Sequence, residues 1–216
     1  MKIWLKVLIA LVSAIALVAI SVLGTIAYFT SQAEVTNVFT VGKITITLDE
    51  SKTDEWGNPV QPEERVTTNT YTLIPGHTYT KDPVVTVAKG SEAAYVRAIV
   101  IVNNKAVMEN KFEFLNASTN ENWELMQSTA ITAGEGELVF EFRYRTDSGS
   151  EIIPRNANSD TKLRAVFDNF RSSGLLTSEM VELLEDLKID VVAHAIQSDG
   201  FTSEEEAWTA FDAQMN

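Results

Sequence analysis

The chain has 216 residues, of which 45% are hydrophobic, and it carries a formal net charge of −13. A surface this acidic repels nucleic acid and anionic lipid headgroups, so neither is an expected partner. The chain has no cysteine, which excludes disulfides, thiolate catalysis and cysteine-ligated zinc or iron–sulfur centres.

The first 27 residues have the layout of a secretory signal. Two lysines precede an uncharged apolar run over residues 7–23, and small residues lead up to Ala27. A positive region, an apolar region and a small-residue cleavage site follow one another in this order in such signals. We therefore expect cleavage between Ala27 and Tyr28, secretion, and a single mature domain over residues 28–216. An uncleaved membrane anchor is the alternative, because the apolar run is at the short end of what spans a bilayer.

The segment that follows, residues 28–41, is rich in β-branched and aromatic residues and contains no proline or glycine. If it is extended, its large apolar residues fall mostly on one side, with Asn37 interrupting the row, and Gly42 then permits a bulge or hinge. One interpretation is a first strand within its own domain. The other is an arm that adds to the sheet edge of a neighbouring subunit. The arm residues that would take part are Tyr28, Phe29, Val35, Val38, Phe39 and Val41.

Alternation of apolar and polar residues predicts strands over much of the remaining chain. The run at 94–102 is apolar on both faces except at Arg97, which indicates a central strand. A turn at 74–77, with Pro75 and Gly76 in the positions typical of type II, and loops at 55–64 and 147–160 separate the strands. The expected strands are 44–48, 84–87, 94–102, 138–145, 163–167 and 187–195.

Two short helices are expected near the C-terminus. One begins after Thr177, where apolar residues recur at helical spacing, and the other follows Ser203, which forms a capping-box pair with Glu206. The second helix would bury Ala207, Trp208 and Phe211. Helices and strands do not alternate regularly, so the predicted fold class is mainly β, a two-sheet antiparallel sandwich with two short helices after an N-terminal signal helix.

Four blocks of the sequence resemble the TasA and camelysin proteins. The most specific are GTIAYFT at 24–30 and FTVGKI at 39–44, and segments 73–82 and 190–201 are similar as well. The resemblance implies a jelly-roll β-sandwich of Gram-positive bacteria that forms biofilm matrix fibres after cleavage by a SipW-type signal peptidase. It also implies that residues 28–41 of one subunit complete the sheet of the next, in a homopolymer with an anchoring or nucleating accessory protein as a further partner.

The camelysin label makes a secreted or cell-surface metallopeptidase the alternative function. A zinc peptidase of the usual kind needs paired histidines on a helix with a glutamate between them. The chain has two histidines, of which we expect His77 to be a solvated turn residue and His194 a packed or hydrogen-bonded strand residue. We therefore expect no catalytic residue, cofactor or metal site. A membrane-anchored sandwich that binds a ligand through its long loops is a third interpretation.

Overall fold

The computed structural model describes residues 44–105, 120–126, 133–184 and 186–215, together with Trp4 and Ile131, and the backbone alone of 30–34, 37–38 and 112–113. The expected signal and the cleavage site between Ala27 and Tyr28 lie outside these residues, apart from Trp4. Phe29, Val35, Phe39, Val41 and Gly42 also lie outside them, so the statements about these residues stay predictions.

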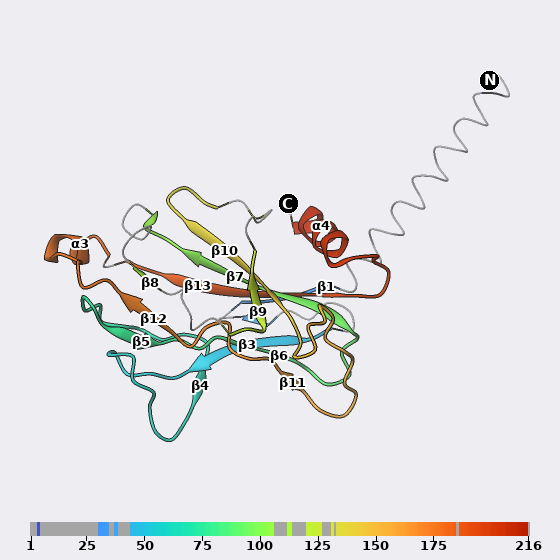
Figure 1. Ribbon diagram of the computed structural model, residues 1–216, viewed down its shortest axis with the longest axis horizontal. Coiled ribbons are helices and arrows are strands. Elements are labelled where there is room, and N and C mark those ends of the chain that lie inside the picture. The colour runs from blue at the N-terminus through green and yellow to red at the C-terminus, as the bar shows by residue number, and fades with distance from the viewer. Residues whose placement is uncertain are drawn as a thin grey trace.

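The described residues form a mainly β fold in which the strand pairings are antiparallel (Figure 1). A six-stranded sheet has the order β2 (Asn37–Val38), β1 (Thr30–Glu34), β13 (Ile189–Gln197), β7 (Ala94–Val102), β10 (Leu138–Tyr144) and β9 (Trp123–Leu125). A four-stranded sheet has the order β11 (Thr161–Lys162), β6 (Val84–Val87), β3 (Ile46–Ser51) and β4 (Arg65–Val66). A three-stranded sheet has the order β5 (Thr78–Thr80), β12 (Asn169–Ser172) and β8 (Phe112–Glu113).

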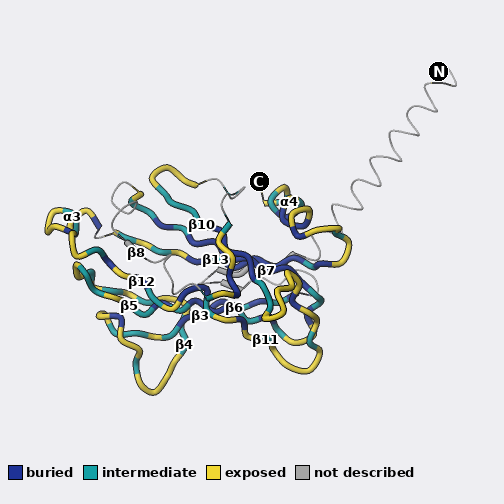
Figure 2. The backbone as a smooth tube through the Cα atoms, viewed as in Figure 1, coloured by how far each residue is buried: buried dark blue, intermediate teal, exposed yellow. Residues whose placement is uncertain are grey.

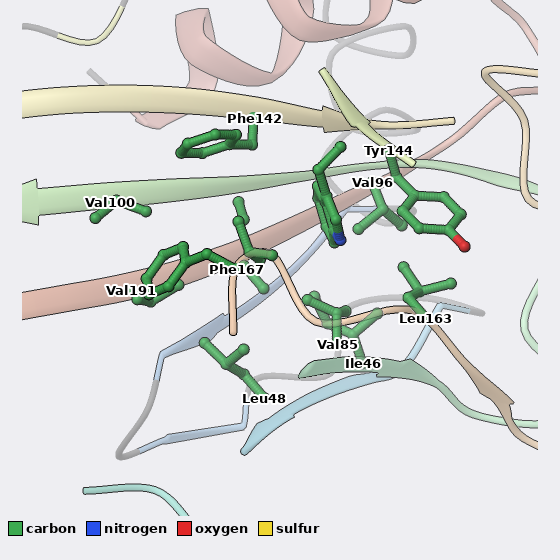
Figure 3. Close-up of a cluster of buried hydrophobic side chains, with 14 of the residues drawn as sticks. Ile46, Leu48, Val85, Val96, Val100, Phe142, Tyr144, Leu163, Phe167 and Val191 are labelled. Atoms are coloured by element: carbon green, nitrogen blue, oxygen red, sulfur yellow. The ribbon is translucent and has the colours of Figure 1, made fainter. Parts of the chain in front are cut away.

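The main core lies between the six-stranded and the four-stranded sheets (Figure 2). Inward-facing residues of β3 and β6 meet those of β7, β10 and β13 there, and residues of the chain after β11 fill the space between them (Figure 3). Burying a large apolar side chain contributes about 1.5–3 kcal/mol. The side chains drawn and labelled in the core are Ile46, Leu48, Val85, Val96, Val100, Phe142, Tyr144, Leu163, Phe167 and Val191.

Most of the expected strands are confirmed. β6 and β7 have the predicted bounds, and β3, β10 and β13 begin or end within three residues of them. β7 lies between β13 and β10, and eight of its nine residues are buried, as its apolar character on both faces indicates. The turn at 74–77 is also confirmed: Gly76 has φ 75°, and the amide of His77 donates to the carbonyl of Ile74 over 3.2 Å.

The expected strand at 163–167 is wrong. The chain forms only the two-residue β11 here, and after it the amides of Leu163 and Val166 donate to the carbonyls of Val85 and Pro83 over 2.9 Å each. Leu163, Val166 and Phe167 are all buried, so this stretch does not alternate between two faces. Its apolar residues therefore reflect insertion of an irregular segment into the core.

Both C-terminal helices are confirmed. Helix α3 (Ser178–Glu182) is capped by Thr177, whose hydroxyl accepts from the Met180 amide. Helix α4 (Glu204–Met215) lies on the face of the six-stranded sheet that points away from β3 and β6 (Figure 1). There Ala207, Trp208 and Phe211 pack with Tyr95 and Ile196 in a second, smaller core.

The capping box of α4 is half formed. The Ser203 hydroxyl accepts from the Glu206 amide over 3.2 Å, as expected. The Glu206 carboxylate accepts from the amide and hydroxyl of Thr202 over 2.7 Å each. These hydrogen bonds lower the pKa of Glu206. They involve Thr202 and not the amide of Ser203, which a complete capping box would use.

Candidate functional site at the edge of strand β13

The beginning of the arm lies at the edge of the six-stranded sheet of its own domain. Strand β1 pairs with β13, with Thr30 opposite Ile196 and Glu34 opposite Val192. The chain then returns as β2, in which Val38 lies opposite Ala33. In this single chain the described residues 30–34 and 37–38 of the segment therefore pair as antiparallel strands within their own domain.

This pairing covers only part of the edge of β13. On its other side β13 is paired with β7 along its whole length, from Ile189 to Gln197. On the side of β1 the pairing stops at Val192. Among the residues that the structure describes, no strand pairs with residues 189–191 on that side. Their backbone groups are therefore a place where another strand could add.

A cavity of about 650 Å³ adjoins residues 189–192 of this edge. Its volume is within the range of sites that bind ligands or peptide side chains. Its apolar lining comes mostly from β12 and residues 184–192, among which Lys188 and Asp190 are charged, and its polar lining comes from Glu50, residues 67–70 and Lys81. The residues that line it are Glu50, Thr67–Tyr71, Leu73, Lys81, Ile101, Phe170, Leu184 and Leu187–Val192.

The polar part of the cavity wall contains a buried ion pair. The Lys81 Nζ lies 2.7 Å from Glu50 Oε2, and the two residues are 6% and 2% exposed. The amide nitrogen of Asn69 donates to Glu50 Oε1 over 3.0 Å. Taking two charges out of water costs several kcal/mol per ion, and their attraction offsets this only when the geometry is good. A charge pair at this position therefore needs an explanation other than stability.

Tyr71 places a neutral hydroxyl beside this pair. Burial, together with the nearby Glu50 carboxylate, raises the pKa of the Tyr71 phenol, so it stays protonated at physiological pH. Its hydroxyl donates to the carbonyl of Thr80 over 2.9 Å. The lining of the cavity thus includes a carboxylate, an ammonium group, an amide and a phenol that lie near one another, next to apolar side chains.

Glu50, Lys81 and Asn69 are functional candidates that the sequence reasoning missed. A signal for Glu50 was present, because the inward-facing row Ile44, Ile46 and Leu48 continues to position 50 with an acid. The same alternation, carried on to position 50, would have indicated a buried carboxylate. Its partners come from residues 69 and 81, and nothing in the local pattern indicated which basic residue they would include.

The two histidines lie in different parts of the fold, one before β5 and one in β13. His77 is half-buried before β5, where its Nε2 lies 2.8 Å from the Trp56 carbonyl oxygen and its ring packs edge-on against Tyr79. It is therefore less solvated than expected. His194 is a buried residue of β13, as expected. The described part of the chain contains no group of three or more His, Cys, Asp or Glu side chains placed to hold a metal ion.

A second concentration of charge lies under α4. Arg97 is 1% exposed, and its guanidinium lies 4.3 Å from the centroid of the Trp208 ring. It donates to both carboxylate oxygens of Asp212, and its Nε donates to His194 Nδ1 over 3.2 Å. The His194 ring stacks on Phe211 with 4.7 Å between ring centroids. All of these groups are directed at one another, so we assign this cluster to holding α4 on the sheet.

His194 should make the stability of the domain depend on pH. Burial, and then the charge of Arg97, lower the pKa of His194 from 6.5 to about 3. The unfolded chain therefore binds a proton at His194 near pH 6.5, whereas the folded chain does not do so until the pH approaches 3. The contribution of His194 to the free energy of unfolding is therefore fully present above pH 6.5 and is lost as the pH falls towards 3. We expect the free energy of unfolding to be about 2 kcal/mol lower at pH 5 than at pH 7 from this residue alone.

Urea unfolding at pH 7 and pH 5 measures this effect. His194→Gln keeps an acceptor for Arg97 without a titrating ring, so this variant should lose most of the difference between the two pH values. If the variant and the natural chain weaken equally between pH 7 and pH 5, the effect does not come from His194.

The comparisons with known proteins add no identification. Neither the family models, nor the curated proteins, nor the solved structures contain a match to this chain. Within the described residues, no helix is long and apolar enough to cross a membrane.

Proposed function

We propose that the protein is a secreted, non-enzymatic subunit of extracellular matrix fibres, a jelly-roll sandwich that polymerises head to tail by strand addition. The observation that carries this proposal is the edge of β13, which among the described residues is paired with β1 only at residues 192–196, beside a cavity of about 650 Å³. The arm that would fill it is residues 28–41, freed after cleavage at Ala27 by a SipW-type signal peptidase. Donation from one copy to the next does not close on itself, so it builds filaments.

The register of β1 supports this use of the edge. Thr30 opposite Ile196 fixes the pairing, and an arm that continued in the same register would place Val35 opposite Val191 and Phe39 opposite Leu187. Residues directly opposite in a sheet share a face. Val191, Ala193 and Ala195 face the main core, so the odd-numbered arm residues would face it too. These are the residues that form the apolar row of the arm.

The same arm cannot take this extended path in its own domain. β3 follows the arm in the chain, and it begins at the end of the sandwich that lies far from the cavity. β3 runs in the same direction as β1: Ile46 lies towards Val96, the partner of Ala195, whereas Leu48 lies towards Val191 (Figure 3). Glu50 borders the cavity together with Ile189. Ile44 is thus about 20 Å back along the chain from the cavity.

The length of the chain between the arm and β3 supports a second copy as the donor. In the extended register Asn37 lies opposite Ile189, and Val41 lies about 13 Å further on, away from Ile44. The three peptide units from Val41 to Ile44 span at most about 11 Å. A chain that passes through Ile44 into β3 must therefore turn its own arm back, as the antiparallel pairing of β1 with β2 does. An arm extended through the cavity has to come from a second copy.

Cysteine cross-linking tests the proposal, since the chain has no cysteine of its own. In the extended register Thr36 lies opposite Asp190, which is exposed. We expect the variant with Thr36→Cys and Asp190→Cys to form a ladder of disulfide-linked multimers in material recovered from producing cells. Each single variant should give dimers at most. A monomer with an internal disulfide would mean that the arm stays in its own domain, and the proposal would be wrong.

Deleting residues 28–41 gives a second measurement. We expect the shortened protein to form no filaments on electron microscopy grids, because the edge of β13 then has no strand to accept. Circular dichroism of the same sample shows whether the domain has folded. A folded protein that makes filaments as abundant as those of the full chain would contradict the proposal.

A further inference from the structure

We propose that the buried Glu50–Lys81 pair recognises Asn37 of the arm donated by a second copy and thereby fixes the register of the added strand. This inference rests on the proposed function and adds the determinant of its specificity. It starts from two polar residues that interrupt apolar rows: Glu50 in the inward-facing row of β3 and Asn37 in the odd-numbered apolar row of the arm sequence.

The register brings these two exceptions together. Continuing the observed pairing of β1 with β13 places Asn37 opposite Ile189. Ile189, Glu50 and Lys81 line the same cavity. The side chain of Asn37 would face the main core, because Val191 and Ala193 of β13 do so. Of the six core-facing positions between 31 and 41, only Ser31 and Asn37 are polar, and Ser31 falls opposite Ala195 at the other end.

The chemistry of a carboxamide matches that of the ion pair. An ammonium group has three donors and a carboxylate has about four acceptor sites, whereas an amide supplies both a donor and an acceptor. Lys81 Nζ donates to Glu50 Oε2 over 2.7 Å. The amide of Asn69 already bonds Glu50 Oε1 over 3.0 Å. The pair therefore holds one amide on one side and has capacity for a second from the cavity.

A wrong register would separate these groups. A shift of two residues would place Val35 or Phe39 against the charges and bury Asn37 beside Val191 or Leu187 without a partner. A buried polar group without a hydrogen bond is costly, and more so beside a charge. A shift of one residue would turn the apolar row of the arm to solvent. A single buried asparagine fixes the register of coiled coils in the same way.

The test replaces Asn37 with valine, which increases the apolar surface of the arm. If hydrophobic burial alone drove addition, Asn37→Val would assemble at least as well as the natural chain. We expect instead a roughly tenfold rise in the protein concentration needed for filaments, because a hydrogen bond to charged groups is lost. Thr36→Val, which changes the neighbouring outward-facing position, is the matched control and should assemble normally.

A second set of variants exchanges the specificity. The double variant Glu50→Leu with Lys81→Met removes both charges together, which buried pairs usually tolerate. We expect it to assemble poorly with the natural arm and normally once Asn37→Val is added. In the cross-linking assay, adding Asn37→Val to the Thr36→Cys arm should also spread its disulfides from position 190 to cysteines placed at 188 and 192.

The outcomes separate this inference from the proposed function. If the chain without residues 28–41 still forms filaments, strand addition itself is wrong. If that deletion abolishes filaments while Asn37→Val assembles and cross-links at 190 like the natural chain, strand addition stands and recognition of Asn37 by the ion pair is wrong.

Discussion

Replacing Arg97 with alanine is expected to lower the free energy of unfolding by about 3–5 kcal/mol, the range for removing one partner of a buried charge pair. Arg97 has four kinds of partner at once: the Asp212 carboxylate, the buried Glu141 carboxylate at 3.8 Å, the His194 ring nitrogen, and the faces of Trp208 and Phe211. Its removal takes the paired guanidinium bonds away from Asp212 and opens a space beneath α4. The helix should then detach before the sheets separate.

Urea unfolding measures this loss, followed by tryptophan fluorescence, to which Trp208 contributes together with the other tryptophans of the chain, and by circular dichroism, which follows the sheets. Arg155→Ala is a matched control, because Arg155 is mostly exposed and lies 3.3 Å from Glu92. Exposed pairs contribute less than about 1 kcal/mol. Arg97→Lys should rescue little, because an ammonium group cannot make the paired bonds to Asp212. A loss below about 1 kcal/mol for Arg97→Ala would contradict the role assigned to this residue.

The sequence identified Arg97 but not its partners. A lone charge in an otherwise apolar run at 94–102 is visible from the residues themselves, and it correctly indicated a central strand. Asp212 lies 115 residues further along and His194 lies 97 residues away. The fold brings these distant residues together, and no local pattern encodes that contact. The same reasoning explains why α4 was predicted as a helix but not placed on the sheet.

The local sequence pattern predicted the regular core strands correctly, but it failed where a buried part of the chain is irregular. The apolar runs of β6 and β7 gave their bounds, because each residue of a core strand obeys the same alternation or burial. Residues 163–167 have the same composition as a strand but insert into the core without pairing along their length. The apolar composition indicates burial in both cases. Only pairing with a neighbouring strand distinguishes a core strand from an irregular buried segment, and the composition does not show this pairing.

One part of the candidate site could be predicted from the sequence pattern and another part could not. The parity of the apolar row in residues 28–41 could be read from the sequence, and it left two interpretations of the arm. The identity of the accepting strand could not be read, because β13 lies more than 150 residues away along the chain. If the arm of a second copy continues the register of β1 on β13, as we propose, the same parity would turn the row towards the core and bring Asn37 to the Glu50–Lys81 pair.

Replacing Lys81 with methionine is expected to destabilise the domain by about 3–5 kcal/mol, because the Glu50 carboxylate would remain buried without its cation. Glu50 is 2% exposed, and its other described partner is the Asn69 amide. The unfolding free energy from urea titration checks this. Lys52→Met is the matched control: Lys52 pairs with Glu64 over a similar distance of 2.8 Å but is exposed, so its loss should cost less than about 1 kcal/mol.

The double variant Glu50→Leu with Lys81→Met separates stability from assembly. Replacing both members of a buried ion pair with apolar residues is often neutral or stabilising by about 1–4 kcal/mol. We therefore expect this variant to be at least as stable as the natural chain, although Lys81→Met alone is not. A pair that the fold does not need for stability would then serve the binding of the donated arm. If the double variant were as unstable as Lys81→Met, the pair would have a structural role, and the argument for an assembly role would lose its physical basis.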